Sequence, residues 1–167
     1  MARIFTVLIG SLLIAGAARA TEPLGFPTPA GWTADDAEAK SRQADAYAND
    51  LRHQPAAEMT AFHLSRPVPY DEAFARGYIK GIQRTLRTAT ELKHEFIEIA
   101  GLRALRFIVE FTDDGETYRQ VQYVLPAGPV TAFLAFTVHR DGFAARLPQF
   151  DAIAKTVRGL APANPVP

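Results

Sequence analysis

The stretch that decides the fold runs from Phe96 to Val138 and reads FIEIAGLRALRFIVEFTDDGETYRQVQYVLPAGPVTAFLAFTV. It contains four runs rich in β-branched and aromatic residues, and each break between two runs carries Gly, Pro or Asp. The runs occupy residues 96–99, 102–112, 118–125 and 130–138. Because the links between them are short, the pattern predicts an up-and-down antiparallel meander of four strands.

The last of these runs is apolar on both sides. Phe133 and Ala135 alternate with Leu134 and Phe136, so neither face of this strand is suited to water. A strand that is apolar on both faces has to be covered on both faces. The sequence therefore predicts helices on both sides of the sheet.

The remaining elements are predicted from apolar periodicity and capping residues. A helix is expected from Thr33 to about His53 on a thin alanine stripe, followed by a strand over residues 59–65. A strongly amphipathic helix is expected from Asp71 to about Thr88, and a closing helix over 143–160, with the helix proper starting near Leu147 because of Pro148. The order predicts an α+β protein: an antiparallel sheet meander covered by helices on both faces, an α/β/α sandwich.

The N-terminus has the pattern of a secretory signal peptide over residues 1–20. A positive start at Arg3 precedes a short apolar run, which ends in Ala18-Arg19-Ala20. The alternative, a membrane anchor, is disfavoured because a spanning helix needs about 20 apolar residues. After the signal peptide we expect an extended lead-in over 21–32, a single domain over 33–160 and a Pro-rich tail over 161–167. We expect a periplasmic or secreted location, and no transmembrane segment in the mature chain.

The amino-acid composition limits which partners the protein can attract and which reactions it can catalyse. The chain has 18 basic and 18 acidic residues, so no global field draws it to nucleic acid. It has no cysteine, which excludes disulfides and a thiol nucleophile. Trp32, the single tryptophan, is expected to pin the lead-in onto the domain, with ligand stacking as the alternative.

Two motifs resemble a known family. The run FIEIAGLRA at 96–104 resembles the hairpin "strand, Gly, x, x, Ala" of the PsbP-like fold, which photosystem II extrinsic subunit P, a fungal Ran-binding import factor and DcrB-like periplasmic proteins share. Phe150, Ile153 and Thr156 resemble the closing helix of that fold, and the resemblance covers roughly residues 59–160. It implies the same architecture and a binding or accessory role without a shared catalytic site; no metal-binding or Ran-binding pattern can be carried over.

Catalytic and metal-binding signals are weak in this sequence. The four histidines, at 53, 63, 94 and 139, form no pair at helical spacing, so no local metal motif exists, and no cofactor is expected. His63 and His139 are on or next to predicted strands, and a metal or hydrolase site near them, with Glu95 or Glu98, is the alternative function. Ser65 is near His63 but does not form a catalytic triad with it by spacing alone.

A basic stripe on the second predicted helix is the most suggestive feature. Arg76, Lys80, Arg84 and Arg87 are spaced by four, four and three residues and are expected to align, with Glu72 as the nearest acid. The simpler interpretation is a solvated outer face. The functional interpretation is contact with an acidic protein surface or an anionic envelope component.

A carrier of a small apolar ligand is a further alternative, because the chain has eleven phenylalanines that would suit either a ligand site or a packed core. The sequence thus predicts an exported, non-enzymatic accessory or binding protein of the bacterial cell envelope, and this interpretation rests on the resemblance and the compartment.

Overall fold

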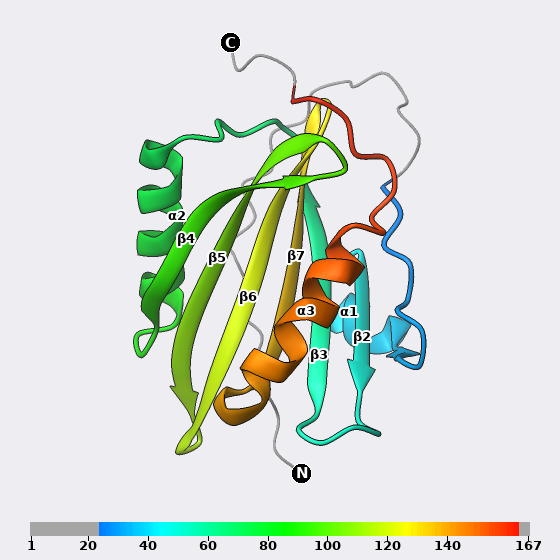
Figure 1. The fold of residues 1–167 in the computed structure, drawn as a ribbon, viewed down its shortest axis with the longest axis vertical. Helices are drawn as coiled ribbons and strands as arrows, with labels where there is room; N and C mark the ends of the chain where they lie inside the picture. The colour runs from blue at the N-terminus through cyan, green and yellow to red at the C-terminus, as the bar shows by residue number, and fades with distance from the viewer. Residues whose placement is uncertain (1–23, 164–167) are drawn as a thin grey trace.

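The computed structural model describes residues 24–163, so the predicted signal peptide lies outside the described residues. One antiparallel sheet in the order β1-β2-β3-β7-β6-β5-β4 forms the centre of the fold (Figure 1). Its strands are β1 (Thr33–Ala34), β2 (Ala46–Asp50), β3 (Ala57–Leu64), β4 (Thr90–Ile99), β5 (Leu102–Asp113), β6 (Glu116–Ala127) and β7 (Val130–His139). The predicted meander is therefore confirmed as β4 to β7, and β3 pairs with its last strand.

Helices cover both faces of this sheet. The helices are α1 (Asp36–Ser41), α2 (Glu72–Thr85) and α3 (Phe143–Ala154), the last preceded by a short 3₁₀ turn, η1 (Arg140–Gly142). Figure 1 shows α3 in front of the sheet and α1 and α2 behind it. None of the helices in residues 24–163 is long and apolar enough to cross a membrane. The α/β/α arrangement agrees with the prediction from the two-sided strand.

Each face has its own apolar core. The core under α3 contains residues of β3, β6 and β7 together with Phe143 and Phe150, whereas the core under α2 contains residues of β5 together with Ile79 and Ile82. Trp32 is buried in the first core, where its ring packs edge-on against Phe150 at 6.4 Å. It therefore holds the lead-in onto the domain, and the expectation of a packing role is confirmed.

The predicted first helix, from Thr33 to His53, is wrong. A six-residue helix, α1, is capped by Asp35, and the chain then turns at Gln43, which has a φ of 54°. The following residues form β2, which pairs with β3 and buries Tyr47 on one face and Ala48 on the other. An alanine stripe buries little area as a helix, whereas a strand paired with β3 buries side chains on both of its faces.

Two further boundaries differ from the prediction. β4 begins at Thr90, six residues before the apolar run, because an edge strand carries charged side chains without cost to the core. α3 begins at Phe143 although Pro148 lies inside it. A proline within a helix removes one backbone hydrogen bond, and here the burial of Phe143, Phe150 and Ile153 outweighs that loss.

The two glycines inside α2 do not approach the sheet. Gly77 and Gly81 are exposed, and a Cβ atom added to either would meet no other atom within 4 Å. They cost helix stability without a packing gain. Gly142 is different, because a Cβ atom there would overlap the ring of Pro55.

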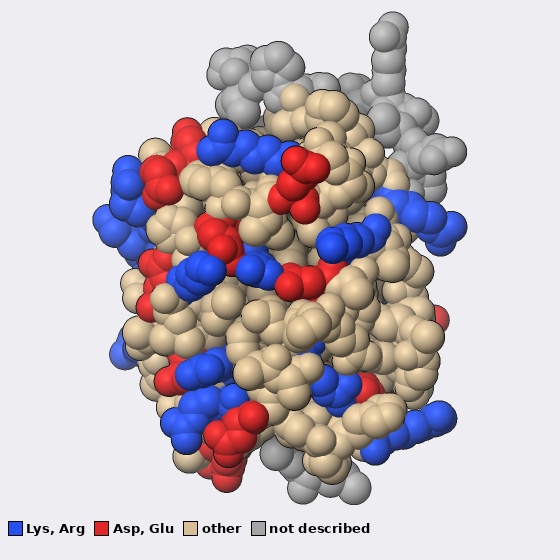
Figure 2. All heavy atoms as spheres, in the orientation of Figure 1, with Lys and Arg blue, Asp and Glu red and all other residues tan. Residues whose placement is uncertain are grey.

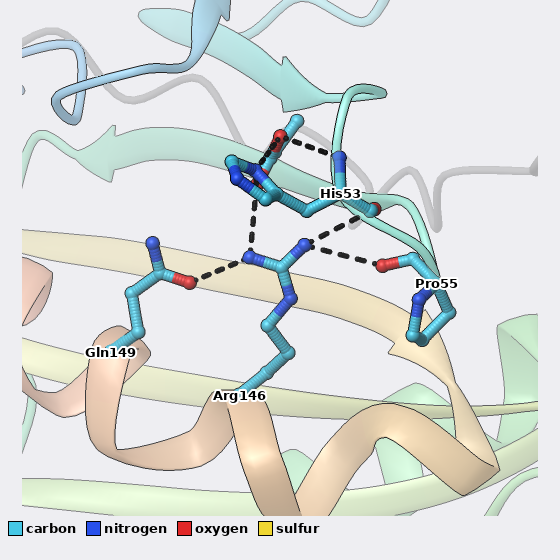
Figure 3. A network of polar contacts seen from close by, with 5 residues as sticks. His53, Pro55, Arg146 and Gln149 are labelled. Atoms are coloured by element: carbon cyan, nitrogen blue, oxygen red, sulfur yellow. Dashed lines mark hydrogen bonds and ion pairs between the residues drawn. The ribbon is translucent and has the colours of Figure 1, made fainter.

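A buried ion pair holds the loop between β2 and β3 against α3 (Figure 3). Nη1 of Arg146 donates to Oδ2 of Asp50 at 2.8 Å, and Nη2 donates to the backbone carbonyl oxygens of His53 and Pro55, both at 3.3 Å. The side chain of Asp50 is only 2% exposed. Its burial favours the neutral form, but hydrogen bonds from His53 and Arg146 outweigh this and lower its pKa.

Substituting alanine for Gly77 or Gly81 is expected to stabilise the protein by about 1 kcal/mol each, because alanine loses less conformational entropy in a helix. The free energy of unfolding from urea titration measures this. Gly142→Ala is the control and should destabilise the protein, since its methyl group has no room. A loss of stability in Gly77→Ala would show that α2 is packed on that side.

Arg146→Met is expected to cost about 3–5 kcal/mol at pH 7, because it leaves the carboxylate of Asp50 buried without its cation and with hydrogen bonds from His53 alone. The loss should be smaller in an Asp50→Asn background, and the difference in a double-mutant cycle gives the coupling. In the wild type, the lowered pKa of Asp50 means that this stabilisation is present above its unfolded pKa and is lost as pH falls through the folded pKa. Additive effects of the two substitutions would contradict the pairing.

Candidate functional site

The basic stripe predicted from the sequence lies on the outer side of α2. Arg76, Lys80 and Arg84 are all exposed, and their spacing of four residues sets them in one line along the helix. We call these three residues the basic line. The opposite side of α2 faces the sheet through the buried residues Ala75, Ile79 and Ile82. The basic line is therefore directed away from the core and toward solvent.

Arg87 does not continue the basic line as expected. α2 ends at Thr85, and Leu86 already has an extended backbone, with φ −107° and ψ 92°. Arg87 lies in the turn that follows and is exposed. The helix ends earlier than the apolar periodicity indicated, so the position of Arg87 is set by the turn and not by helical spacing.

The basic line has little neutralising charge around it. Glu72 approaches Arg76 at 3.9 Å between Oε2 and Nη1, at the limit of an ion pair. Within residues 24–163, no acidic side chain forms an ion pair with Lys80 or Arg84. An exposed cation without a counter-ion keeps its full charge available to a partner.

The face covered by α3 shows the opposite arrangement. Figure 2 shows basic and acidic side chains close together across the middle of this face. Arg106 donates to both carboxylate oxygens of Asp151, at 2.6 and 2.8 Å, and also pairs with Glu95, which in turn pairs with Lys93 at 2.7 Å. Charges on this face are satisfied by one another, so the unneutralised basic line on α2 is not simply the general character of the surface.

His94 binds the acid at the start of α2. Its Nε2 lies 3.0 Å from Oε2 of Glu72, and its Nδ1 contacts Glu91 on the same strand. Hydrogen bonds to Glu91 and to Glu72 raise the pKa of His94. A raised pKa means that this contact stabilises the fold below the unfolded pKa and weakens as pH rises through the folded value. Glu72 is thus shared between His94 and Arg76, which leaves still less negative charge for the basic line.

The alternative site at His63 and His139 is contradicted by the register of the sheet. His63 on β3 pairs with Ala132 on β7, and Ala132 is seven residues before His139 on the same strand. At about 3.3 Å per residue, the two histidines lie about 23 Å apart. They stand near opposite ends of β7 and cannot bind one ion or one substrate atom together.

Each histidine instead has an acidic neighbour of its own. Nδ1 of His63 lies 2.6 Å from Oδ2 of Asp45, and Nε2 of His139 lies 3.2 Å from Oε2 of Glu116. Neither Glu95 nor Glu98, the acids suggested by sequence proximity, is among these partners. Across the part of the chain that the structure describes, no group of three or more His, Asp or Glu side chains is arranged to hold a metal ion.

The aromatic residues considered for an apolar ligand pack against one another. Phe136 stacks on Phe150 with ring centres 4.6 Å apart, and Phe62 stacks on Phe133 at 4.8 Å. Both pairs belong to the two cores. These contacts favour the interpretation of the phenylalanines as core residues.

Sequence reasoning missed a set of polar side chains on the sheet face that α1 and α2 share. We call this set the polar row; its members, all buried, are Glu58, Thr60, Gln120, Gln122 and Thr137. Glu58, Thr137 and Gln120 are directly opposite one another on β3, β7 and β6. Thr60 and Gln122 lie two residues further along their strands, on the same face of the sheet, and Ala135 of β7 lies between them. The signal was present as the alternation Gln120-Val121-Gln122 inside an apolar run.

Hydrogen bonds connect much of the polar row. The hydroxyl of Tyr78, from α2, donates to Oε1 of Gln122 at 2.7 Å. The amide of Gln122 donates to Oε1 of Gln120, whose own amide donates to the hydroxyl of Thr137 at 2.8 Å. This chain links α2 to the centre of the sheet through polar contacts in a face that is otherwise apolar.

Glu58 is the charged member of the polar row. Its carboxylate accepts a hydrogen bond from the hydroxyl of Tyr47 at 3.0 Å and lies 3.5 Å from Nη2 of Arg42, at the end of α1. Burial raises the pKa of Glu58, although Arg42 and Tyr47 act in the opposite direction. The acid is therefore compensated by a cation and carries little net charge into the sheet face.

Comparisons with known proteins indicate the fold. Neither a family model nor a curated protein matches this chain. Among solved structures, the cyanobacterial PsbP protein of Synechocystis is 14% identical with a TM-score of 0.60, and the match covers 81% of this chain and 85% of that one. A Pseudomonas aeruginosa protein of unknown function is 17% identical with a TM-score of 0.54, covering 70% of this chain and 80% of that one.

A third structure, LpqN of Mycobacterium tuberculosis, is described as involved in cell envelope biogenesis. It is 14% identical with a TM-score of 0.53, and the match covers 80% of this chain and 81% of LpqN. Identities this low show a shared architecture, and they do not transfer an activity. The resemblance noted in the hairpin and the closing helix is confirmed: this chain has the PsbP-like fold.

Proposed function

We propose that this protein is an exported, non-enzymatic accessory protein of the bacterial cell envelope, and that it binds an anionic partner through the basic line of α2. The observation that carries the proposal is the line itself: Arg76, Lys80 and Arg84 are exposed and aligned, and among residues 24–163 only Arg76 of the three has an acid within 4 Å. Arg87, in the turn after α2, extends the positive surface at the C-terminal end of the helix.

The setting of α2 favours a docking role over a solvated face. The helix is fixed to the sheet by the core beneath it, by the bond from Tyr78 to Gln122, and by the contact between His94 and Glu72. Fixed cations lose less entropy on binding than mobile ones do. α2 itself carries a single acid, Glu72, so no stripe of matching acids along the helix neutralises its cations.

The proposed location in the cell envelope rests on two observations: the N-terminal sequence pattern, and the description of one protein that has the same fold. Residues 1–20 have the charge, apolar length and small-x-small end of a signal peptide. One of the structures with this fold is described as part of cell envelope biogenesis. The partner that fits the basic line in that compartment is an acidic protein surface or an anionic envelope component.

Reversing the basic line is expected to weaken binding to an isolated envelope fraction by about tenfold or more. Each exposed ion pair contributes up to roughly 1 kcal/mol, and 1.4 kcal/mol corresponds to a factor of ten. The variant is Arg76→Glu/Lys80→Glu/Arg84→Glu, measured by co-sedimentation at low and high salt. Wild-type binding should fall at high salt, because exposed charges are screened.

The matched control carries the same change of charge elsewhere. Arg52, Arg66 and Lys155 are also exposed, and replacing all three by Glu alters the net charge equally. This control should bind almost as the wild type does. Equal losses in both triple variants would mean that only net charge matters, and unchanged binding in the α2 variant would refute the proposal.

Export predicts that the protein recovered from the host envelope begins at Thr21, because cleavage follows Ala20. N-terminal sequencing of the tagged protein tests this. Replacing Ala18 and Ala20 by Leu should block processing, since the cleavage site requires small residues. A full-length protein confined to the cytoplasm would contradict the proposed location and leave the α2 surface to be tested on its own.

A further inference from the structure

The polar row lies between the two helices that cover its face of the sheet. α1 packs on β2 at one side, and α2 packs next to β4 at the other. Figure 1 shows the two helices behind opposite sides of the sheet, with β3, β7 and β6 between them. The members of the polar row come from these three middle strands.

Ala135 is the point at which solvent reaches this part of the sheet. It lies at the centre of β7, and yet it is partly exposed, whereas its neighbours on the same face, Thr60 and Gln122, are only 7% and 5% exposed. The methyl group of Ala135 is shorter than the side chains of Thr60 and Gln122 on either side of it. A ligand that entered there would meet Thr60 on one side and Gln122 on the other.

The side chains around Ala135 have hydrogen-bonding capacity that the fold does not use. The hydroxyl of Thr60 makes no hydrogen bond to a described residue and is open to solvent, although the residue as a whole is only 7% exposed. Gln120 and Gln122 each donate through Nε2 to one acceptor, although an amide carries two N–H donors. Three donors that are not fully used by the protein therefore lie around one solvent-accessible position, an arrangement that suits a ligand with several oxygens.

Charge and shape narrow the chemistry of that ligand. Arg42 offsets Glu58, so the row favours neither an anion nor a cation. Phe62, two residues from Thr60 on the same face, stacks on Phe133 and is partly exposed, which provides an aromatic surface beside the polar groups. Neutral hydroxyls on one side and C–H groups on the other are the features of a sugar ring.

We propose that the polar row is the floor of a binding site for a neutral sugar unit of a glycan. The sugar sits over Ala135, its hydroxyls bond to Thr60 and to the free amide hydrogens of Gln120 and Gln122, and its C–H face rests on Phe62. This site is on the sheet face, separate from the outward-facing basic line of α2, and does not depend on the function proposed for that line.

The test is a titration of the ¹⁵N-labelled protein with three neutral disaccharides, maltose, cellobiose and chitobiose, followed by NMR. At least one sugar should shift the side-chain amide signals of Gln120 and Gln122 at millimolar concentrations. Thr60→Val should lower the affinity for that sugar by about tenfold, because the substitution removes one hydrogen bond and leaves the shape of the side chain unchanged. Ala135→Leu should abolish the shifts by filling the access point.

Two controls make the result decisive. Ala73→Leu adds the same bulk on the exposed side of α2 and should not alter binding, and the triple Glu variant of the basic line should bind the sugar normally. No shift with any of the three sugars, or equal affinity in Thr60→Val and the wild type, overturns the proposal. If Ala135→Leu does not fold by circular dichroism, Thr60→Val decides.

Discussion

The structure depends on a sheet that has to be covered on both faces. β7 is the central strand, and its side chains alternate between the core under α3 and the face under α2, with Leu134 and Phe136 on one side and Phe133 on the other. Once this strand is two-sided, a helix has to lie on each face, and the chain supplies α3 for one and α2 with α1 for the other. The surfaces discussed above follow from that requirement, because α2 can present cations outward only while its other side is held in a core.

The two faces are nevertheless built differently. Under α3 the residues of β6 and β7 are apolar, and the charged groups around the helix pair with one another, as Arg106 does with Asp151. Under α1 and α2 the same strands carry the polar row, and the pairing is incomplete at Thr60. The α3 face is therefore an apolar core framed by paired charges, whereas the opposite face has polar groups at its centre that are open to solvent.

The sequence predicted what depended on local pattern and failed where tertiary contacts decide. The meander was predictable because turn residues separate β-branched runs, and α2 because its apolar residues repeat at helical spacing. Residues 44–50 were misassigned because alanine favours a helix by intrinsic propensity, whereas pairing with β3 decides their structure in the fold. The basic line was predictable from the spacing of its residues along the helix, whereas the position of Arg87 was not, because the helix ends before it. The polar row was not, because its residues converge from three strands only after the register is known.

The central claim is that α2 carries the surface that meets a partner. The most direct measurement uses two variants, each with one photo-crosslinking amino acid. One variant carries it at position 80, on the basic line, and the other at position 155, just after α3 on the other side of the sheet. Both variants are mixed with the envelope fraction and irradiated. We predict crosslinks from position 80 that disappear at high salt and few from position 155. Crosslinks from position 155 that persist in salt, with none from position 80, would contradict the account and assign the partner to the α3 face.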